Sequence, residues 1–131
     1  MTDDARPTLL IADDDAVVRS ALGAQLEGDF RVVAVAETVA EAVQLAEQHQ
    51  PDAALVDVEM PEGGAHTAVP QIAARSPGTC IVILSGDESH DVVLELLSAG
   101  AIAYIRKGIP TSDIAKTLTD ALGAKGDQPR G

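Results

Sequence analysis

Five short apolar runs alternate with longer amphipathic stretches along this chain. Short apolar runs bounded by polar or glycine-containing segments are typical of strands that are buried on both faces of a parallel sheet. They predict strands near residues 8–13, 31–36, 52–57, 79–84 and 101–105. The other stretches have apolar residues at helical spacing and predict helices near residues 15–27, 38–49, 67–75, 88–98 and 111–123. This alternation predicts one α/β domain.

Three of the expected helices have a clear apolar stripe. The stripes are Val18, Ala21, Leu22 and Leu26; Val39, Ala42, Val43 and Ala46; and Ile114, Leu118, Ala121 and Leu122. Thr38 and Glu41 have the spacing of a capping box, which marks the start of the second helix. The third helix is harder to place, because Gly63 and Gly64 precede it and Pro70 falls early within it. We therefore expect it to begin late, near residue 67, after a mobile loop.

Composition and charge narrow the classes of partner. The 131 residues are 46% hydrophobic and 23% charged, which suits a single globular domain. The formal net charge of -12, with only nine Lys and Arg, disfavours nucleic-acid binding by this segment. No apolar stretch has the length of a membrane span, and residues 1–4 lack the features of a secretion signal. With Cys80 expected to be a buried free thiol, these features predict a cytoplasmic protein.

Polar side chains lie where four of the predicted strands end. Asp13 and Asp14 are at the end of the first strand, Asp57 at the end of the third, Ser85 after the fourth and Lys107 after the fifth. Because the carboxyl ends of parallel strands border one crevice of an open α/β sheet, we expect all five side chains to converge there. Carboxylates about 4 Å apart repel by roughly 4 kcal/mol at an effective dielectric of about 20, so the pocket needs a neutralising cation. Mg²⁺ suits such oxygen ligands, and Mn²⁺ would fit nearly as well.

Four sequence strings carry this pattern in order along the chain. They are Leu10-Ile11-Ala12-Asp13-Asp14-Asp15, Ala54-Leu55-Val56-Asp57-Val58-Glu59-Met60-Pro61, Ile83-Leu84-Ser85-Gly86 and Gly100-Ala101-Ile102-Ala103-Tyr104-Ile105-Arg106-Lys107. On these strings, the chain resembles the CheY-like receiver domain of two-component response regulators over residues 7–123. The resemblance implies a flavodoxin-like, doubly wound (βα)5 fold with a five-stranded parallel sheet in the strand order 2-1-3-4-5.

The resemblance also implies a role for each charged residue of the site. Asp57 would be the phosphoacceptor, taking a phosphoryl group from a phosphohistidine to form an acyl phosphate. Asp14, Asp57 and the backbone carbonyl of Glu59 would bind Mg²⁺ directly, and Asp13 would act through a metal-bound water. Lys107 would pair with the phosphoryl oxygens.

A conformational switch follows from the same resemblance. After phosphoryl transfer, the Ser85 hydroxyl would hydrogen-bond a phosphoryl oxygen, and its movement would vacate space into which Tyr104 can rotate. The face made by the fourth helix, the fifth strand and the fifth helix would then change shape. Val93, Leu97 and Tyr104 are the candidate partner contacts on that face, although packing against the sheet would explain Val93 and Leu97 equally well.

The resemblance implies a signalling phosphoacceptor that catalyses only its own phosphorylation and dephosphorylation. Its phosphoryl donor would be a sensor histidine kinase or a phosphotransfer protein, and its target an output domain in cis or a separate protein. Residues 1–7 would be an N-terminal tail, residues 8–123 the receiver domain, and residues 124–131 a C-terminal tail or a linker to an output domain. Homodimerisation through exposed helix faces stays open.

Two alternative functions use similar residues. A phosphohydrolase of the haloacid dehalogenase type also combines an aspartyl nucleophile, Mg²⁺ and a lysine on a parallel sheet. Its nucleophile lies on the first strand and is followed two residues later by a second Asp, whereas Asp57 lies on the third predicted strand and Glu59 follows it. A pseudo-receiver would use the fold only for protein interaction. The joint presence of Asp14, Asp57, Ser85 and Lys107 argues against that alternative.

Overall fold

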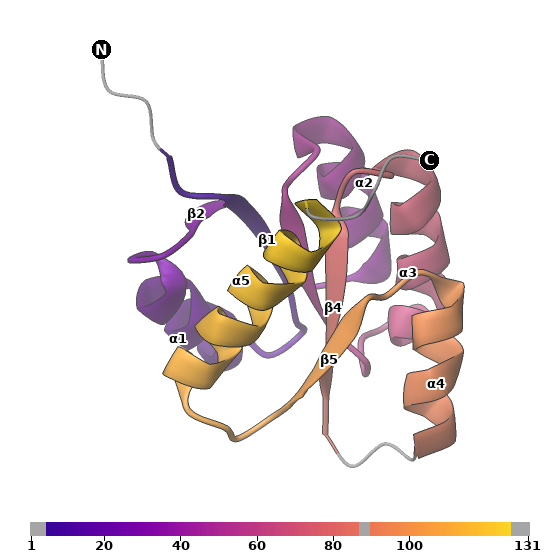
Figure 1. Cartoon of the computed structure of the whole chain (residues 1–131). Helices are drawn as coiled ribbons and strands as arrows, with labels where there is room; N and C mark the ends of the chain where they lie inside the picture. Colours follow the sequence, from indigo (N-terminus) through magenta and orange to yellow (C-terminus); the bar gives the residue numbers. More distant parts are fainter. Residues whose placement is uncertain (1–4, 87–89, 127–131) are drawn as a thin grey trace.

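A parallel sheet forms the middle layer of the molecule, and helices cover both of its faces (Figure 1). The computed structural model describes residues 5–86 and 90–126. In chain order the elements are β1 (Thr8–Ala12), α1 (Ala16–Leu26), β2 (Arg31–Ala36), α2 (Val39–His49), β3 (Ala53–Asp57), α3 (Gly64–Arg75), β4 (Cys80–Ser85), α4 (His90–Ala99), β5 (Ala103–Arg106) and α5 (Thr111–Gly126).

The sheet has the strand order β2-β1-β3-β4-β5, and each neighbouring pair is parallel. The chain moves from β1 outward to β2 and then returns to place β3 on the other side of β1. The connections therefore lie on opposite faces of the sheet, and β1 and β3 flank the point where the winding reverses. The predicted flavodoxin-like fold and its strand order are confirmed.

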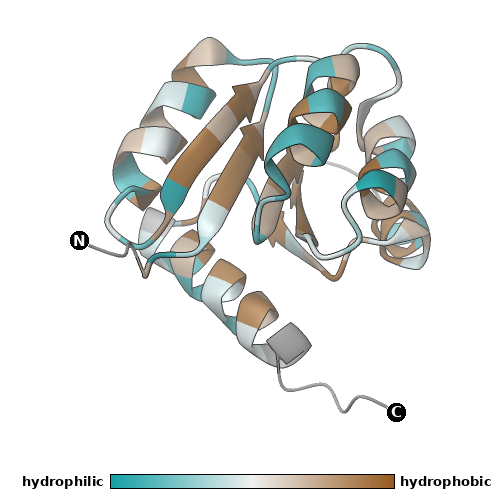
Figure 2. Cartoon of the chain, turned by 90° about the horizontal axis from the view of Figure 1, so that it is seen from above, coloured by the Kyte–Doolittle hydropathy of each residue, from teal (hydrophilic) through white to brown (hydrophobic). Residues whose placement is uncertain are grey.

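Consecutive residues of the central strands pack against different helices. Leu10 and Ala12 of β1 belong to the cluster beneath α2, α3 and α4, while Leu9 and Ile11 belong to the cluster beneath α1 and α5. The same alternation holds in β3 and β4. Because both faces are covered, the strands need apolar residues at every position, which is why they are continuous apolar runs (Figure 2).

The first residues of the helices and their buried apolar faces largely agree with the predictions from the sequence. The Asp15 side chain accepts hydrogen bonds from the backbone N–H groups of Val17 and Val18 at the start of α1. Thr38 caps α2 by accepting from the N–H of Glu41, as the capping-box spacing predicts. The α2 stripe is fully buried. In the α1 stripe, Ala21 is an exception, because it is exposed to solvent.

The start of α3 differs from the prediction. The helix begins at Gly64 rather than near residue 67, and Pro70 lies inside it. Gly63 and Gly64 have φ angles of 101° and 61°, and the N–H of Ala65 donates to the carbonyl of Val58 at 3.1 Å. The two glycines therefore let the chain reverse immediately after β3, so that the helix needs no long loop before it.

Two other boundaries also differ. Helix α5 continues to Gly126, three residues beyond its predicted end, so the first part of the expected tail is helical. Residues 127–131 and 1–4 lie outside the described residues, as do 88 and 89, where the fourth helix was expected to begin. Strand β5 starts at Ala103 instead of residue 101. Within the described part of the chain, no helix has the length and hydrophobicity needed to cross a membrane.

Gly64 should be intolerant of a side chain. A Cβ atom built there would lie 2.2 Å from the backbone carbonyl oxygen of Val58, at a φ angle that favours glycine. We expect Gly64→Ala to lower the free energy of unfolding by roughly 2 to 4 kcal/mol in urea denaturation. Gly23→Ala is the matched control, because nothing lies within 4 Å of a Cβ there; it should raise stability by up to about 1 kcal/mol. Equal stability of the two variants would contradict this account.

Candidate functional site

The carboxyl ends of four strands bring the predicted site residues to one edge of the sheet. Asp57 is the last residue of β3 and Ser85 the last of β4, while Asp13 and Lys107 lie just beyond β1 and β5. Backbone hydrogen bonds fix the positions of neighbouring strand ends relative to one another. The N–H of Val58 donates to the carbonyl of Leu84, and the N–H of Lys107 donates to the carbonyl of Ser85. The topology therefore places residues far apart in sequence around one pocket.

Three carboxylates crowd this pocket. Asp13, Asp14 and Asp57 each have a carboxylate oxygen within 4.8 Å of the others. Asp13 and Asp57 are 0% and 2% exposed, whereas Asp14 faces solvent. Asp13 Oδ1 accepts a hydrogen bond from the N–H of Asp15, but Asp13 Oδ2 is buried with no hydrogen-bond partner among the described residues. A buried anionic oxygen without a donor points to a ligand that carries positive charge.

Lys107 enters the same pocket from β5. Its Nζ lies 2.9 Å from Asp57 Oδ1 and 3.7 Å from Asp13 Oδ2. Burial alone would lower the pKa of Lys107, but the hydrogen bond to Asp57 and its negative charge raise that pKa above its usual value. Lys107 therefore stays an ammonium group that holds the Asp57 carboxylate in place.

Burial also shifts the pKa values of two carboxyl groups in the pocket, those of Asp57 and Asp13. Burial raises the pKa of Asp57 to about 6, although the hydrogen bond from Lys107 acts in the opposite direction. Burial likewise raises the pKa of Asp13, against the hydrogen bond from the Asp15 N–H and the charge of Lys107. The pocket therefore holds ionised carboxylates at a cost that a divalent cation would relieve.

The residues present fit a hard divalent cation. All three donors are carboxylate oxygens, and one of them is exposed to incoming ligands. One buried oxygen lacks a hydrogen-bond partner within residues 5–86 and 90–126. Mg²⁺ is commonly held in proteins by one or two carboxylates that leave room for waters and phosphate oxygens. Glu59 adjoins the pocket through its N–H, which donates to Asp57 Oδ1 at 3.3 Å.

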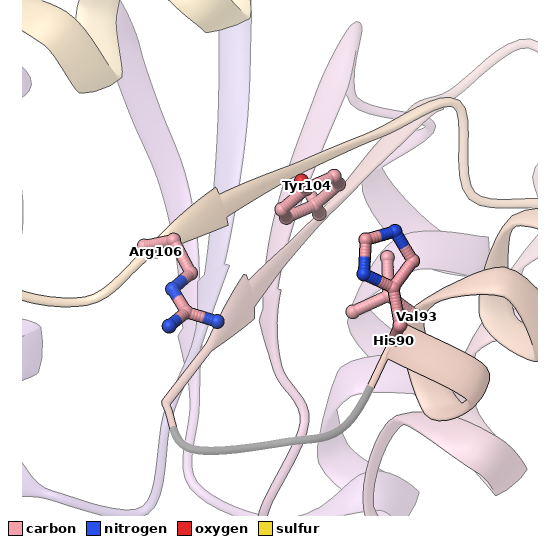
Figure 3. A pocket seen from close by; sticks show the side chains of 4 residues that line it. All are labelled: His90, Val93, Tyr104 and Arg106. Atoms are coloured by element: carbon pink, nitrogen blue, oxygen red, sulfur yellow. The ribbon is translucent and has the colours of Figure 1, made fainter.

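Ser85 and Tyr104 lie on the face of the sheet that α4 covers. Ser85 is fully buried, whereas 44% of Tyr104 is exposed. Tyr104 pairs with Ile83 and Arg106 pairs with Ser85 along β4 and β5. A cavity of about 40 Å³ lies beside Tyr104 and is also lined by His90, Val93 and Arg106 (Figure 3). The structure thus shows Tyr104 in an outward position, next to empty space.

Comparison with protein-family models shows which family has this sequence pattern. The model for the response regulator receiver domain matches residues 9–119. The chain belongs to the response regulator receiver domain family. Receiver domains are signalling phosphoacceptors of two-component systems rather than classical enzymes.

The curated relatives of this receiver domain are regulatory proteins longer than this chain. It is 37% identical over 115 residues to the transcriptional regulatory protein PdtaR of Mycobacterium tuberculosis, covering 87% of this chain and 56% of that protein. It is 36% identical over 113 residues to the oxygen regulatory protein NreC of Staphylococcus carnosus, covering 84% of this chain and 52% of that protein. The chain thus spans about half the length of these relatives.

Solved structures show the same fold. A CheY-like receiver domain protein from Methanospirillum hungatei superposes with a TM-score of 0.87 at 24% identity, covering 95% of this chain and all of that one. The receiver domain of the sensor histidine kinase PA1611 from Pseudomonas aeruginosa has a TM-score of 0.80 at 24% identity, covering 91% of this chain and 99% of that one. Its structure contains a magnesium ion coordinated in the active-site cleft.

The expected partner face of the receiver domain needs one correction. Val93 is only 6% exposed and packs in the core, so it is not a surface contact. Leu97 is half-buried against the same cluster. Leu94, which the sequence analysis did not single out, is 53% exposed. Only the packing of α4 shows which of its apolar side chains faces solvent.

Two positioning contacts were missed from the sequence. Arg19 Nη1 donates to the backbone carbonyl of Asp13 at 2.7 Å, and Arg19 Nη2 lies 3.6 Å from Glu37 Oε2. Glu62 Oε1 accepts a hydrogen bond from the N–H of Ala40 at 3.1 Å. The Arg19 contacts join α1 to the segments that follow β1 and β2, and the Glu62 contact joins the β3–α3 loop to α2. None of these contacts has a spacing motif that could have revealed it.

Replacing Asp57 should stabilise the metal-free receiver domain. Because the pKa of Asp57 is about 6 when folded and 3.8 ordinarily, the folded state pays a penalty for the charged form above pH 6 that vanishes as the pH falls toward 3.8. We expect Asp57→Asn to raise the free energy of unfolding at pH 8 without divalent cations by about 1 to 3 kcal/mol. The gain should shrink toward pH 5, as measured by urea denaturation.

The exposed Asp29→Asn serves as control and should change stability little at either pH. Adding Mg²⁺ should stabilise the parent protein more than Asp57→Asn, because an ion that binds only the folded state stabilises it. A parent that is more stable than Asp57→Asn in metal-free buffer at pH 8 would contradict the account of crowded charge.

Proposed function

We propose that this receiver domain is a phosphorylation-controlled signalling switch in which Asp57 accepts a phosphoryl group from a histidine kinase or a phosphotransfer protein. The observation that carries the proposal is the contact between Lys107 Nζ and Asp57 Oδ1 within a group of three carboxylates. This arrangement combines a buried nucleophile, a cation for the phosphoryl oxygens and the donors of a metal site.

Asp57 is the nucleophile in this proposal. A carboxylate oxygen of Asp57 attacks the phosphorus of a phosphohistidine, the P–N bond breaks, and the imidazole leaves with its electron pair, so that an acyl phosphate remains. With a folded pKa of about 6, Asp57 is mostly ionised near pH 7.5 and needs no general base. Lys107 is already in place to pair with the oxygens of the incoming group.

Mg²⁺ is the proposed cofactor. Asp14, Asp57 and the backbone carbonyl of Glu59 would hold the ion directly, and Asp13 would act through a bound water. When bound, the ion would offset negative charge on the phosphoryl group during transfer. Two features support this assignment: Asp13 Oδ2 has no hydrogen-bond partner in the described part of the chain, and Asp14 is exposed. Mn²⁺ has the same ligand preference and is the alternative ion.

Ser85 and Tyr104 form the proposed switch. The Ser85 hydroxyl would turn toward a phosphoryl oxygen on Asp57, and Tyr104 would rotate inward from its exposed position. The cavity of about 40 Å³ beside Tyr104 supports such a rearrangement. The surface around α4, β5 and α5, including Leu94, would then change shape for a target.

The output is proposed from the relatives. Because the chain spans about half of regulators such as PdtaR, we propose residues 8–123 as the signalling unit, residues 1–7 as a tail and residues 124–131 as a tail or linker into which α5 extends as far as Gly126. The receiver would control an output domain in cis or a separate target, with homodimerisation as one route. Nucleic-acid contacts would come from outside this acidic segment. The proposed donors act in the cytoplasm, which is where the proposal places the domain.

The phosphohydrolase alternative is not favoured. The candidate nucleophile Asp57 lies on β3 rather than on the first strand, and the exposed side chain of Glu59 follows it where that class has a general acid. The pseudo-receiver alternative differs from the proposal in one measurable property, which is formation of the acyl phosphate.

Incubation with acetyl phosphate and Mg²⁺ should add one phosphoryl mass to the intact protein. Asp57→Asn should abolish the added mass because it removes the nucleophile, and a metal chelator should suppress it in the parent protein. Intact-protein mass spectrometry is the measurement. No added mass in the parent would favour the pseudo-receiver, and steady turnover of a generic phosphate ester would favour the phosphohydrolase.

Tyr104 provides a direct readout of the switch. The chain has one Tyr and no Trp, so its tyrosine fluorescence comes from Tyr104 alone. Phosphorylation by acetyl phosphate should change this fluorescence in the parent and in Ser85→Thr, which keeps the hydroxyl, but not in Ser85→Ala, in which the acyl phosphate still forms. An equal change in Ser85→Ala would show that the hydroxyl does not couple Asp57 to Tyr104.

A further inference from the structure

Two backbone hydrogen bonds hold the base of the loop between β3 and α3. The N–H of Val58 donates to Leu84, and the carbonyl of Val58 accepts from the N–H of Ala65. The base therefore holds the first residue after Asp57 from both sides. These two bonds do not hold the outer residues of the loop, Glu59 to Gly63. Within that stretch the N–H of Glu59 donates to Asp57 Oδ1, and Met60 is buried.

Glu62 attaches the outer part of this loop to α2, and its own backbone has an unusual conformation. Its φ angle is 74°, and Gly63 and Gly64 follow it with positive φ angles, so three consecutive residues are left-handed. A glutamate in this region costs conformational energy and persists where surrounding contacts hold it. The contact that holds Glu62 is the hydrogen bond from the N–H of Ala40 to its Oε1, across 22 residues of sequence.

Ala40 lies in the first turn of α2, where helix N–H groups need acceptors from outside the helix. Thr38 already satisfies the N–H of Glu41, and Glu62 satisfies that of Ala40. A carboxylate is also favoured there by the partial positive charge of the helix N-terminus. The bond therefore joins the β3–α3 loop to α2 with a charged acceptor in a suitable place.

The end of β2 and the segment that leads into α2 are also joined to the loop that carries Asp13. The carbonyl of Ala36 accepts from the N–H of Asp13 at 3.0 Å. Arg19 donates to the Asp13 carbonyl and lies within ion-pair distance of Glu37. The segment from Ala36 to Ala40 thus contacts both acidic loops of the site.

We infer that Glu62 is a positioning residue for the divalent cation: its hydrogen bond to α2 holds the β3–α3 loop, with Glu59, at a set distance from the Asp13 loop. This inference rests on the proposed function, because it concerns the ion that Asp14, Asp57 and Glu59 would bind. Glu62 itself does not touch the ion. It is exposed, so its replacement leaves the core intact.

Mg²⁺ titration of the 131-residue protein by calorimetry tests the inference. Glu62→Ala should weaken Mg²⁺ binding by roughly three- to tenfold, the effect of losing one hydrogen bond that orders the loop. Glu62→Gly should weaken it equally, because it relieves the positive φ angle but restores no acceptor. Glu62→Gln should bind within about twofold of the parent, since its amide oxygen still accepts from Ala40.

Thr38→Ala is the matched control. It removes another cap from the same turn of α2 and lowers helix stability without touching the β3–α3 loop. It should keep the parent affinity for Mg²⁺. Amide hydrogen exchange without metal is the second readout, and residues 59–63 should exchange faster in Glu62→Ala and Glu62→Gly only.

Three results would overturn the inference. Parent-like affinity in Glu62→Ala would show that Val58 and the buried Met60 hold the loop alone. Equal weakening in Thr38→Ala would assign the effect to helix stability, and equal weakening in Glu62→Gln would assign it to charge. Failure of the proposed function looks different: the parent would then show no Mg²⁺ binding that Asp57→Asn removes, whatever residue 62 is.

Discussion

The contact between Lys107 and Asp57 is the interaction on which the site depends. Three carboxylates and one ammonium group meet in a partly buried pocket, which leaves a net formal charge of −2 that a divalent cation would neutralise. Without Lys107 the burial of Asp13 and Asp57 side by side would be still less favourable. The site thus carries an excess of negative charge that suits a divalent cation.

The backbone of the sheet carries this arrangement. Parallel strands place Asp57, Ser85 and the residues beyond β1 and β5 at one edge, and the N–H of Lys107 bonds to the Ser85 carbonyl. Two acidic loops extend from this edge, and the segment from Ala36 to Ala40 contacts both of them. The rigid part of the fold therefore sets which groups meet, while hydrogen bonds between loops set how far apart they lie.

Features with a strong local sequence signal were predicted more closely than features with a weak one. Fully buried strands produce unbroken apolar runs, so the strands and their polar ends were predicted closely. The start of α3 was wrong because Gly63 and Gly64 were interpreted as a mobile loop, whereas their positive φ angles make a tight reversal. Val93 was a candidate partner contact with packing against the sheet as the equally favoured alternative, and its burial supports the packing alternative.

The amino-acid sequence by itself determined the fold class, the strand order through its family motifs, and the identities of the acidic residues, the hydroxyl and the lysine. These features depend on local periodicity and on residue types at strand ends, which the chain carries directly. The tertiary structure decided that Asp13 Oδ2 has no hydrogen-bond donor among the residues that the structure describes. It also decided that Leu94 rather than Val93 faces solvent, and that Glu62 bonds to Ala40. Such features depend on the packing of segments distant in sequence, and no local pattern encodes them.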